Sequence, residues 1–351
     1  MKMKKLVAAT MTAAMLIGTL SGCGGGGGGG GGAVKNEDGS ITIRLAGTMP
    51  ANHQLSLSSQ KFADLVNERS EGTIKVEFYP AGQLFNDETM ITSIPQGGVE
   101  MGVCQTANWS SMVPEAEWFT LSGYWDDYDW FERCCYGEPG QYVMDKIEEK
   151  CGVKILTLFN YGVCELVSTM PLEGPESFDG SKMRMLGTSE ALYLKALGGA
   201  PVSISASENY EGLQKGTIDG ASTGPSSVLS RKLHEVAPYV TLGTYLKETK
   251  YFLMMNGKVW DSLTEEQQQM MQECADEALE YNLQAAKEED ANDIAELEAM
   301  EGVTVSEWSD ETFDEIQAIV LPDVLDNFKN MVGEETYNYL MDASEALREE
   351  S

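Results

Sequence analysis

The sequence predicts an α/β protein built as two lobes, with one long helix that crosses both. Strand-like and helix-like segments alternate from the start of the body, as strand 41–47, helix 55–69 and strand 73–79. That order favours a parallel or mixed sheet covered by helices. The body holds about 310 residues, too many for one typical core, which favours two lobes. Residues 263–300 contain neither glycine nor proline and keep a helical stripe.

The first 22 residues are typical of an export signal peptide. Lys2, Lys4 and Lys5 precede an apolar run over 6–20, which is shorter than the ~20 residues needed to cross a bilayer. The sequence LSGC, ending at Cys23, resembles the lipobox of bacterial lipoproteins, whose cysteine receives the lipid. An ordinary signal peptide that ends near a cysteine is the alternative. We expect lipidation at Cys23 and a location on the outer face of the cytoplasmic membrane.

Residues 23–40 predict a flexible tether between this anchor and the body. Nine consecutive glycines occupy 24–32, and a polar stretch continues to Ser40. Such a segment buries no apolar surface and holds no fixed backbone. No later segment is long and apolar enough to span a membrane, so we expect a soluble body outside the cytoplasm.

Further alternation continues through both lobes. The patterns predict a helix near 87–94, strands near 99–104 and 153–159, a strand over 181–186, helices over 190–197 and 207–215, and a strand over 218–222. Thr264 and Gln267 resemble a capping box at the start of the long helix, which would span roughly 50–55 Å at 1.5 Å per residue. We expect the first lobe to comprise 41–160 and 251–285, and the second 161–250 and 286–351.

Charge and composition exclude several classes of function. The formal net charge is −32, and such a surface repels nucleic acid and anionic lipid headgroups. Six cysteines besides Cys23 show no regular framework, which favours buried free thiols over disulfides. With His53 and His234 as the two histidines and no Cys-x-x-Cys, we expect no metal site and no cofactor. No Gly-x-Ser-x-Gly or recognisable carboxylate pair is present, so we expect no enzyme.

Five segments in order resemble the DctP-type solute receptors of tripartite ATP-independent periplasmic (TRAP) transporters. They are FADLVNERSEGTIKVEFYPAGQL (62–84), IPQGGVEM (94–101), FDGSKMR (178–184), ENYEGLQKGTIDG (208–220) and LMMN (253–256). The resemblance implies a two-lobed periplasmic-binding-protein-like fold with the ligand cleft between the lobes. It implies a monomeric receptor that binds a small organic carboxylate and delivers it to TRAP membrane subunits. A receptor of the same fold that serves a signalling protein, and an extracellular hydrolase, are the alternatives.

Arg184 is the main candidate for ligand binding. In the family, the arginine of the 178–184 motif forms a bidentate ion pair with a substrate carboxylate, and the planar guanidinium suits that geometry. The alternative is an exposed arginine at a strand end. Some relatives carry a second arginine twenty residues earlier, where this chain has Cys164. The resemblance therefore implies one dominant carboxylate contact, supplemented by neutral polar groups.

Those neutral groups are expected where strands end, because ligands of open α/β sheets bind there. The candidates are Thr48, Asn52 and His53 after the first strand, Gln105, Thr106 and Asn108 after the strand ending at Cys104, Thr223 after the strand ending at Ser222, and Tyr245, where relatives often carry histidine. Trp109 is the candidate for an apolar wall. For each polar residue the alternative is a loop side chain that satisfies nearby backbone, and for Trp109 it is a core position. Arg231 is expected to be exposed.

Overall fold

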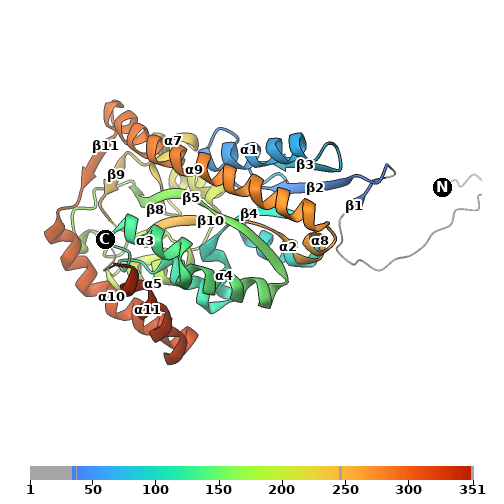
Figure 1. The fold of residues 1–351 in the computed structure, drawn as a ribbon. Helices are drawn as coiled ribbons and strands as arrows, with labels where there is room; N and C mark the ends of the chain where they lie inside the picture. Colours follow the sequence, from blue (N-terminus) through green and yellow to red (C-terminus); the bar gives the residue numbers. More distant parts are fainter. Residues whose placement is uncertain (1–33, 37, 245–246, 349–351) are drawn as a thin grey trace, which may run out of the picture. The chain divides into compact units, whose positions relative to one another are not determined.

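A computed structural model describes residues 34–36, 38–244 and 247–348 of the chain (Figure 1). The predicted signal peptide, Cys23, most of the tether and Tyr245 lie outside these residues. The strands are β1 (Val34–Lys35), β2 (Ile41–Ala46), β3 (Ile74–Tyr79), β4 (Met101–Gln105), β5 (Val153–Ser168), β6 (Lys182–Arg184), β7 (Ala200–Val202), β8 (Gly220–Thr223), β9 (Tyr239–Leu242), β10 (Lys247–Asn256) and β11 (Thr304–Glu307).

The helices alternate with these strands as the sequence patterns predict. The α-helices are α1 (Gln54–Arg69), α2 (Asp87–Gln96), α3 (Tyr128–Tyr136), α4 (Glu138–Cys151), α5 (Gly187–Ala196), α6 (Asn209–Lys215), α7 (Pro225–Ser230), α8 (Gly257–Asp261), α9 (Glu265–Ala299), α10 (Asp310–Val332) and α11 (Glu334–Arg348). Short 3-10 helices are η1 (Thr106–Ser111), η2 (Pro114–Thr120), η3 (Pro175–Phe178), η4 (Ala206–Glu208) and η5 (Leu233–Glu235). None of the described helices is long and apolar enough to cross a membrane.

Two sheets share the long strand β5. The first contains β1, β2, β3, β4 and β10 with the early part of β5, and β2 runs parallel to β3 and β4. The second contains the late part of β5 with β6, β7, β8, β9 and β11, and β6 runs parallel to β7 and β8. We call the layers around these sheets the first and the second lobe. β10 pairs antiparallel with β5 over 153–164, so two strands connect the lobes.

The pairing of β1 corrects one prediction. Val34 pairs with Thr42 and Lys35 with Ile41, and the Asn36 amide side chain donates to Ser40 Oγ at 2.9 Å. The expectation of a flexible tether as far as Ser40 is therefore wrong for residues 34–36 and 38–40. The open edge of β2 provides backbone partners that composition alone does not reveal.

The long helix is confirmed as a single element. α9 contains 35 residues and begins at Thr264, where the predicted capping box with Gln267 is present. It contacts α1 in the first lobe, α7 and β11 in the second, and β5 between them. Its Asn282 is fully buried and donates to Gln54 Oε1 at 2.8 Å and to the Asn160 carbonyl at 3.1 Å. These bonds fix the helix where the two strands cross between the lobes.

The core divides into clusters on both sides of the sheets. Four tryptophans of the first lobe pack in one cluster, which is closed by the second half of α10 and by α11 through Val324, Phe328 and Leu340. The first half of α10 packs instead with Trp308 and Met183 in the second lobe. The C-terminal helices therefore contact both lobes, and the predicted lobe bounds stay a prediction. No disulfide joins the six cysteines of the described residues to one another.

Candidate functional site

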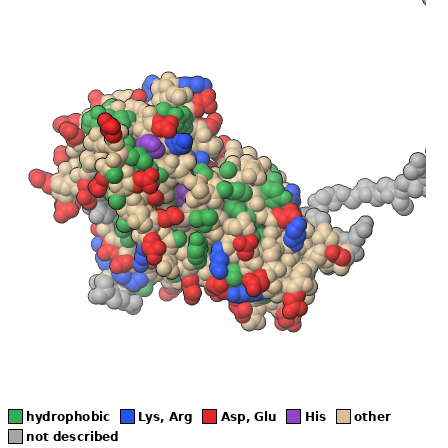
Figure 2. All heavy atoms as spheres, turned by 90° about the horizontal axis from the view of Figure 1, so that it is seen from above, with side chains coloured by type: hydrophobic (Ala, Val, Ile, Leu, Met, Phe, Trp, Pro, Cys, Tyr) green, Lys and Arg blue, Asp and Glu red, His purple; other side chains and the backbone are tan. Residues whose placement is uncertain are grey.

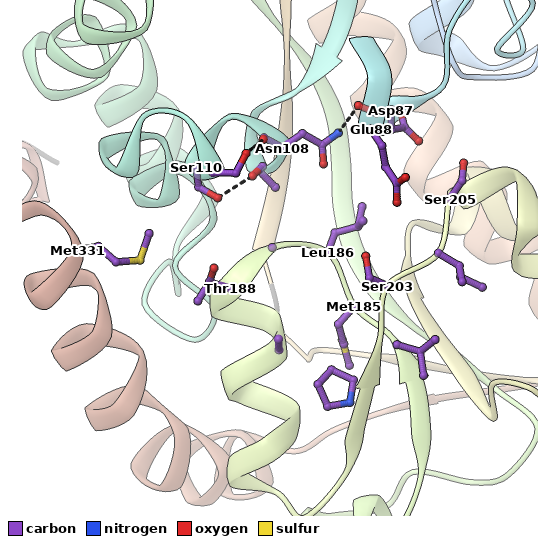
Figure 3. Close-up of a pocket in the computed structure, with 17 residues that line it drawn as sticks. Asp87, Glu88, Asn108, Ser110, Met185, Leu186, Thr188, Ser203, Ser205 and Met331 are labelled. Carbon is purple, nitrogen blue, oxygen red and sulfur yellow. Dashed lines mark hydrogen bonds between the residues drawn. The ribbon is translucent and has the colours of Figure 1, made fainter. Parts of the chain in front are cut away.

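A cavity of about 470 Å³ opens between the two lobes (Figure 3). Its walls are the segments that follow β4, β6 and β7, namely Ala107–Ser111 in part, Met185–Thr188 and Ser203–Ser205, together with the start of α2 and Met331 of α10. The strands of each lobe that precede these walls belong to its parallel part. The cavity therefore occupies the carboxyl ends of parallel strands, where open α/β sheets bind ligands.

Arg184 lies beside this cavity, although it is not itself among the lining residues. It is the last residue of β6, and the side chains of Met185 and Ile204 beside it line the cavity. Only 3% of Arg184 is exposed. Its Nε donates to the Ile204 carbonyl at 3.3 Å and its Nη1 to the Ser222 carbonyl at 2.9 Å. Within the described residues no carboxylate lies within ion-pair distance, so the guanidinium is positioned by backbone oxygens and keeps unused donors.

Three aromatic rings form a stack, and one of them, Tyr161, connects the two lobes. The rings of His53 and Tyr161 lie 5.2 Å apart, and those of Tyr161 and Tyr251 lie 5.8 Å apart. Tyr161 Oη accepts from the Gly224 amide at 3.0 Å and lies 3.2 Å from Thr223 Oγ1. Burial raises the pKa of Tyr251 well above its usual value, and the nearby Arg184 cation partly opposes that rise. Both phenols therefore stay neutral hydrogen-bonding groups.

Three buried hydroxyls in the same region have no hydrogen-bond partner in the part of the chain that the structure describes. They belong to Thr48, Thr106 and Ser222, which follow the carboxyl end of β2, follow that of β4 and lie near that of β8. Buried polar atoms are nearly always paired. None of the three lines the cavity, and all lie buried close to the carboxyl ends of the strands.

His53 is held as a neutral side chain rather than as a titrating one. Its Nδ1 accepts from the Leu55 amide at 3.2 Å, so the proton is assigned to Nε2, which donates to Ser226 Oγ at 3.1 Å. Burial, together with the charge of Arg231, lowers the pKa of His53 to about 3. The bond to Ser226 connects α7 to the start of α1 and so bridges the lobes.

Arg231 and Asn52 do not lie where the sequence suggests. Arg231 is half-buried and donates from Nη2 to the Thr48 carbonyl at 3.3 Å, so the prediction that it is exposed is wrong. It folds back because the backbone after β2 offers an acceptor across the lobe junction. Asn52 is exposed and borders a separate pocket of about 290 Å³ with acidic side chains of α9.

The remaining predicted residues divide between cavity and interior. Asn108 lines the cavity and donates from Nδ2 to the Asp87 carbonyl at 3.3 Å. Gln105 is buried at the end of β4, opposite Tyr251 in the sheet register. Cys164 is buried, with Sγ 3.1 Å from Thr249 Oγ1. Trp109 is fully buried in the core cluster of the first lobe and does not line the cavity, which matches the core alternative.

Sequence reasoning missed Tyr161, Tyr251 and the acidic pair Asp87 and Glu88. The two tyrosines lie on β5 and β10 among apolar residues, where an aromatic side chain is normally core. Asp87 and Glu88 begin α2, and acidic residues are common in the first turn of any helix. Asp87 and Glu88 line the cavity, whereas Tyr161 and Tyr251 lie buried outside its lining.

Comparisons with known proteins show the family of the chain. Residues 45–330 match the family DctP, described as bacterial extracellular solute-binding protein, family 7. The chain is 29% identical over 301 residues to the C4-dicarboxylate-binding periplasmic protein DctP of Rhodobacter capsulatus, covering 84% of this chain and 89% of that protein.

Solved structures share the two-lobed fold. A TRAP periplasmic solute-binding protein of Sulfurospirillum deleyianum with bound succinate is 25% identical with a TM-score of 0.79, covering 86% of this chain and 98% of the other. The sugar acid binding protein DctPAm of Advenella mimigardefordensis, in complex with galactonate, is 24% identical with a TM-score of 0.82 over 88% and 99% of the two chains. The predicted α/β fold in two lobes is confirmed.

Proposed function

This chain belongs to family 7 of the bacterial extracellular solute-binding proteins, the DctP family, and on that premise we propose that it captures a small organic carboxylate on Arg184 between its lobes. It is an extracytoplasmic receptor of the TRAP type, which delivers its ligand to the membrane subunits of the transporter. The family consists of transport receptors and is not an enzyme family.

One observation carries the assignment of Arg184. The chain has 56 acidic and 24 basic residues. On the face drawn in Figure 2, carboxylates are spread widely, with fewer lysines and arginines among them. Arg184 is nevertheless buried without a carboxylate within ion-pair distance among the described residues. An unpaired buried charge destabilises a protein by several kcal/mol (roughly 3–5). A carboxylate ligand in the adjacent cavity would supply the missing partner.

The neutral groups of the cleft complete the proposed site. The unpaired hydroxyls of Thr48, Thr106 and Ser222 lie buried behind the cavity, and Thr223 is held by Tyr161. Cys164 carries no positive charge in the place where some relatives have a second arginine. We therefore assign one carboxylate contact to Arg184 and propose neutral contacts for the rest of the ligand.

Anchoring and assembly are further parts of the proposal. The lipobox-like sequence at Cys23 supports a lipid anchor on the outer face of the cytoplasmic membrane. We propose that the receptor acts as a monomer, because both lobes of the cleft come from one chain. We also propose that it catalyses no reaction, because the family consists of transport receptors. A hydrolysis screen with chromogenic esters and glycosides tests the absence of catalysis, and light scattering tests the monomer.

The ligand is identified by mass spectrometry of small molecules released when the purified full-length protein is denatured. We expect an organic acid from the wild type and from Arg69→Ala, which alters an exposed arginine of α1. Arg184→Ala should release none of it. Equal amounts of the acid from Arg184→Ala and the wild type would contradict the assignment.

A further inference from the structure

The walls of the interlobe cavity combine neutral hydrogen-bonding groups with negative charge. Asn108, Ser110, Thr188, Ser203 and Ser205 contribute amide and hydroxyl groups, and the charged lining residues are Asp87 and Glu88. No lysine, arginine or histidine is among the described residues that line it. The Arg184 cation lies next to the wall formed by Met185 and Ile204, and two carboxylates line the cavity at the start of α2.

Asp87 is the more informative of the two acidic residues. It is the first residue of α2 and is 7% exposed. Its backbone carbonyl accepts from Asn108, but its carboxylate accepts no hydrogen bond from any described residue. A negative charge in the first helical turn stabilises the helix, yet this effect does not require burial. A buried carboxylate needs hydrogen-bond donors, and here the cavity is the side from which they can come.

Glu88 extends this acidic end toward the opposite wall. The residue is exposed, and its side chain points from α2 into the space above Leu186 (Figure 3). The Asp87 charge also acts on the Tyr251 phenol, which the Arg184 cation influences as well. The residues next to the guanidinium, Met185 and Ile204, line the same cavity as Asp87, so a ligand that binds Arg184 from this cavity has the acidic residues in its other wall.

The hydroxyl groups of the cavity suit a ligand that is rich in hydroxyls itself. Ser110 Oγ donates to the Ala107 carbonyl at 2.9 Å, so its oxygen remains free to accept. The Thr188 and Ser203 hydroxyls make no hydrogen bond to other described residues, and Asn108 Oδ1 likewise has none. Such groups pair with either donors or acceptors, whereas Asp87 and Glu88 accept only.

From these observations we propose that the ligand is a polyhydroxylated monocarboxylate, the chemistry of a sugar acid, and that Asp87 and Glu88 reject dicarboxylates. This inference rests on the proposed function, since it takes the single carboxylate to Arg184. The distal hydroxyls donate to the Asp87 and Glu88 carboxylates and exchange hydrogen bonds with the serine and threonine side chains. The volume of about 470 Å³ fits a small polar ligand of this kind.

Charge repulsion sets the expected selectivity. A ligand whose second carboxylate comes within about 6 Å of Asp87, at an effective dielectric constant of about 20, loses affinity roughly 100-fold. A hydroxyl at the same place gains a charge-assisted hydrogen bond. Relatives of both kinds exist, one with succinate and one with galactonate, so similarity does not choose between them and the acidic end does.

The test compares galactonate, succinate and glutamate by titration calorimetry on the full-length protein, first stripped of ligand. The variants are Asp87→Asn and Glu88→Gln, singly and together, because each removes a charge and keeps the shape. Asp64→Asn, an exposed carboxylate on α1, is the matched control. We expect the wild type to prefer galactonate to succinate by about 100-fold, and the double variant to narrow that ratio at least 10-fold.

Three results would overturn the inference. Tighter binding of succinate than galactonate by the wild type is the first, and a ratio unchanged within twofold in the double variant is the second. The third is tightest binding of glutamate with loss in Asp87→Asn, which would identify an ammonium group at the acidic end. Arg184→Ala distinguishes failure of this inference from failure of the proposed function. If Arg184→Ala loses all binding while the acidic variants keep the wild-type ratio of galactonate to succinate affinity, the selectivity alone is refuted. If Arg184→Ala still binds the ligand, the carboxylate site itself is refuted.

Discussion

Replacing Arg184 by alanine is the most direct perturbation of the proposed receptor. The guanidinium is positioned by the Ile204 and Ser222 carbonyls at 3.3 and 2.9 Å and has no carboxylate partner among the described residues. A ligand carboxylate that enters the closed cleft therefore depends on this cation. Arg184→Lys keeps the charge but loses the planar fork, and we expect it to remain clearly impaired.

The magnitude follows from burial. Removing one partner of a buried, hydrogen-bonded charge pair costs roughly 2–5 kcal/mol, or about thirty-fold to several-thousand-fold in affinity. The stability of the ligand-free protein should change much less. Alanine leaves two buried carbonyls without a donor, at about 1–3 kcal/mol each, but it also removes an unpaired buried cation, whose desolvation opposes folding. We expect the melting temperature of the ligand-free variant to stay within about 4 °C of the wild type.

Titration calorimetry with the identified ligand measures the affinity, and thermal unfolding without ligand measures the stability. Arg69→Ala serves as the control, since Arg69 is exposed and pairs with Glu277 away from the cleft. A large loss of affinity with nearly constant stability marks a ligand contact. The reasoning is refuted if folded Arg184→Ala binds within threefold of the wild type, or if affinity and stability fall together.

Three further predictions concern a buried acid, the strand crossing and the anchor. Burial raises the pKa of Glu165 to about 7, despite hydrogen bonds from the Gly243 and Thr244 amides. The folded state therefore holds the proton more tightly than the unfolded state, and stability is lost as pH rises from about 4.5 to 7. In urea unfolding at pH 5 and 8, Glu165→Gln should remove up to about 3 kcal/mol of that loss. An equal pH dependence in both proteins would contradict this. Gly162 has φ +100°, and an added Cβ would lie 2.5 Å from Asp290 Oδ2. Gly162→Ala should therefore lower the unfolding free energy by about 2–4 kcal/mol. A change under about 0.5 kcal/mol, which ordinary surface substitutions also produce, would count against strain at this position. Cys23→Ser should release the receptor into the medium with unchanged affinity, and retention in the membrane fraction after washing would exclude the lipid anchor.

The elements that the sequence predicts best are those set by local chemistry. The start of α9 follows from Thr264 and Gln267, because a capping box involves residues three apart. Arg184 follows from a motif within one strand and its approach. The predicted end of the tether is wrong, since the pairing of Val34 with Thr42 depends on an available strand edge and not on the composition of the segment.

The cleft itself is beyond such local patterns. Asp87, Tyr161 and Tyr251 are separated by many residues, and each has an ordinary explanation in its own element, as a helix start or a core strand position. Trp109 shows the converse case, because its polar neighbours suggest a ligand wall while the indole lies inside the core. Arg231, expected at the surface, instead donates across the lobe junction. Only the pairing of the strands decides these placements.

The position of β10 has a consequence for how the chain acquires its structure. β10 lies between β4 and β5, so the central sheet of the first lobe stays open until residues 247–256 have been made. Ser344 then completes the interior by accepting from the Trp118 and Trp130 indoles at 3.2 and 2.7 Å. Pairings over such sequence separations form slowly. During synthesis the nascent receptor therefore cannot complete this sheet until residues 247–256 have been made, which delays native folding and favours export of the chain before it folds.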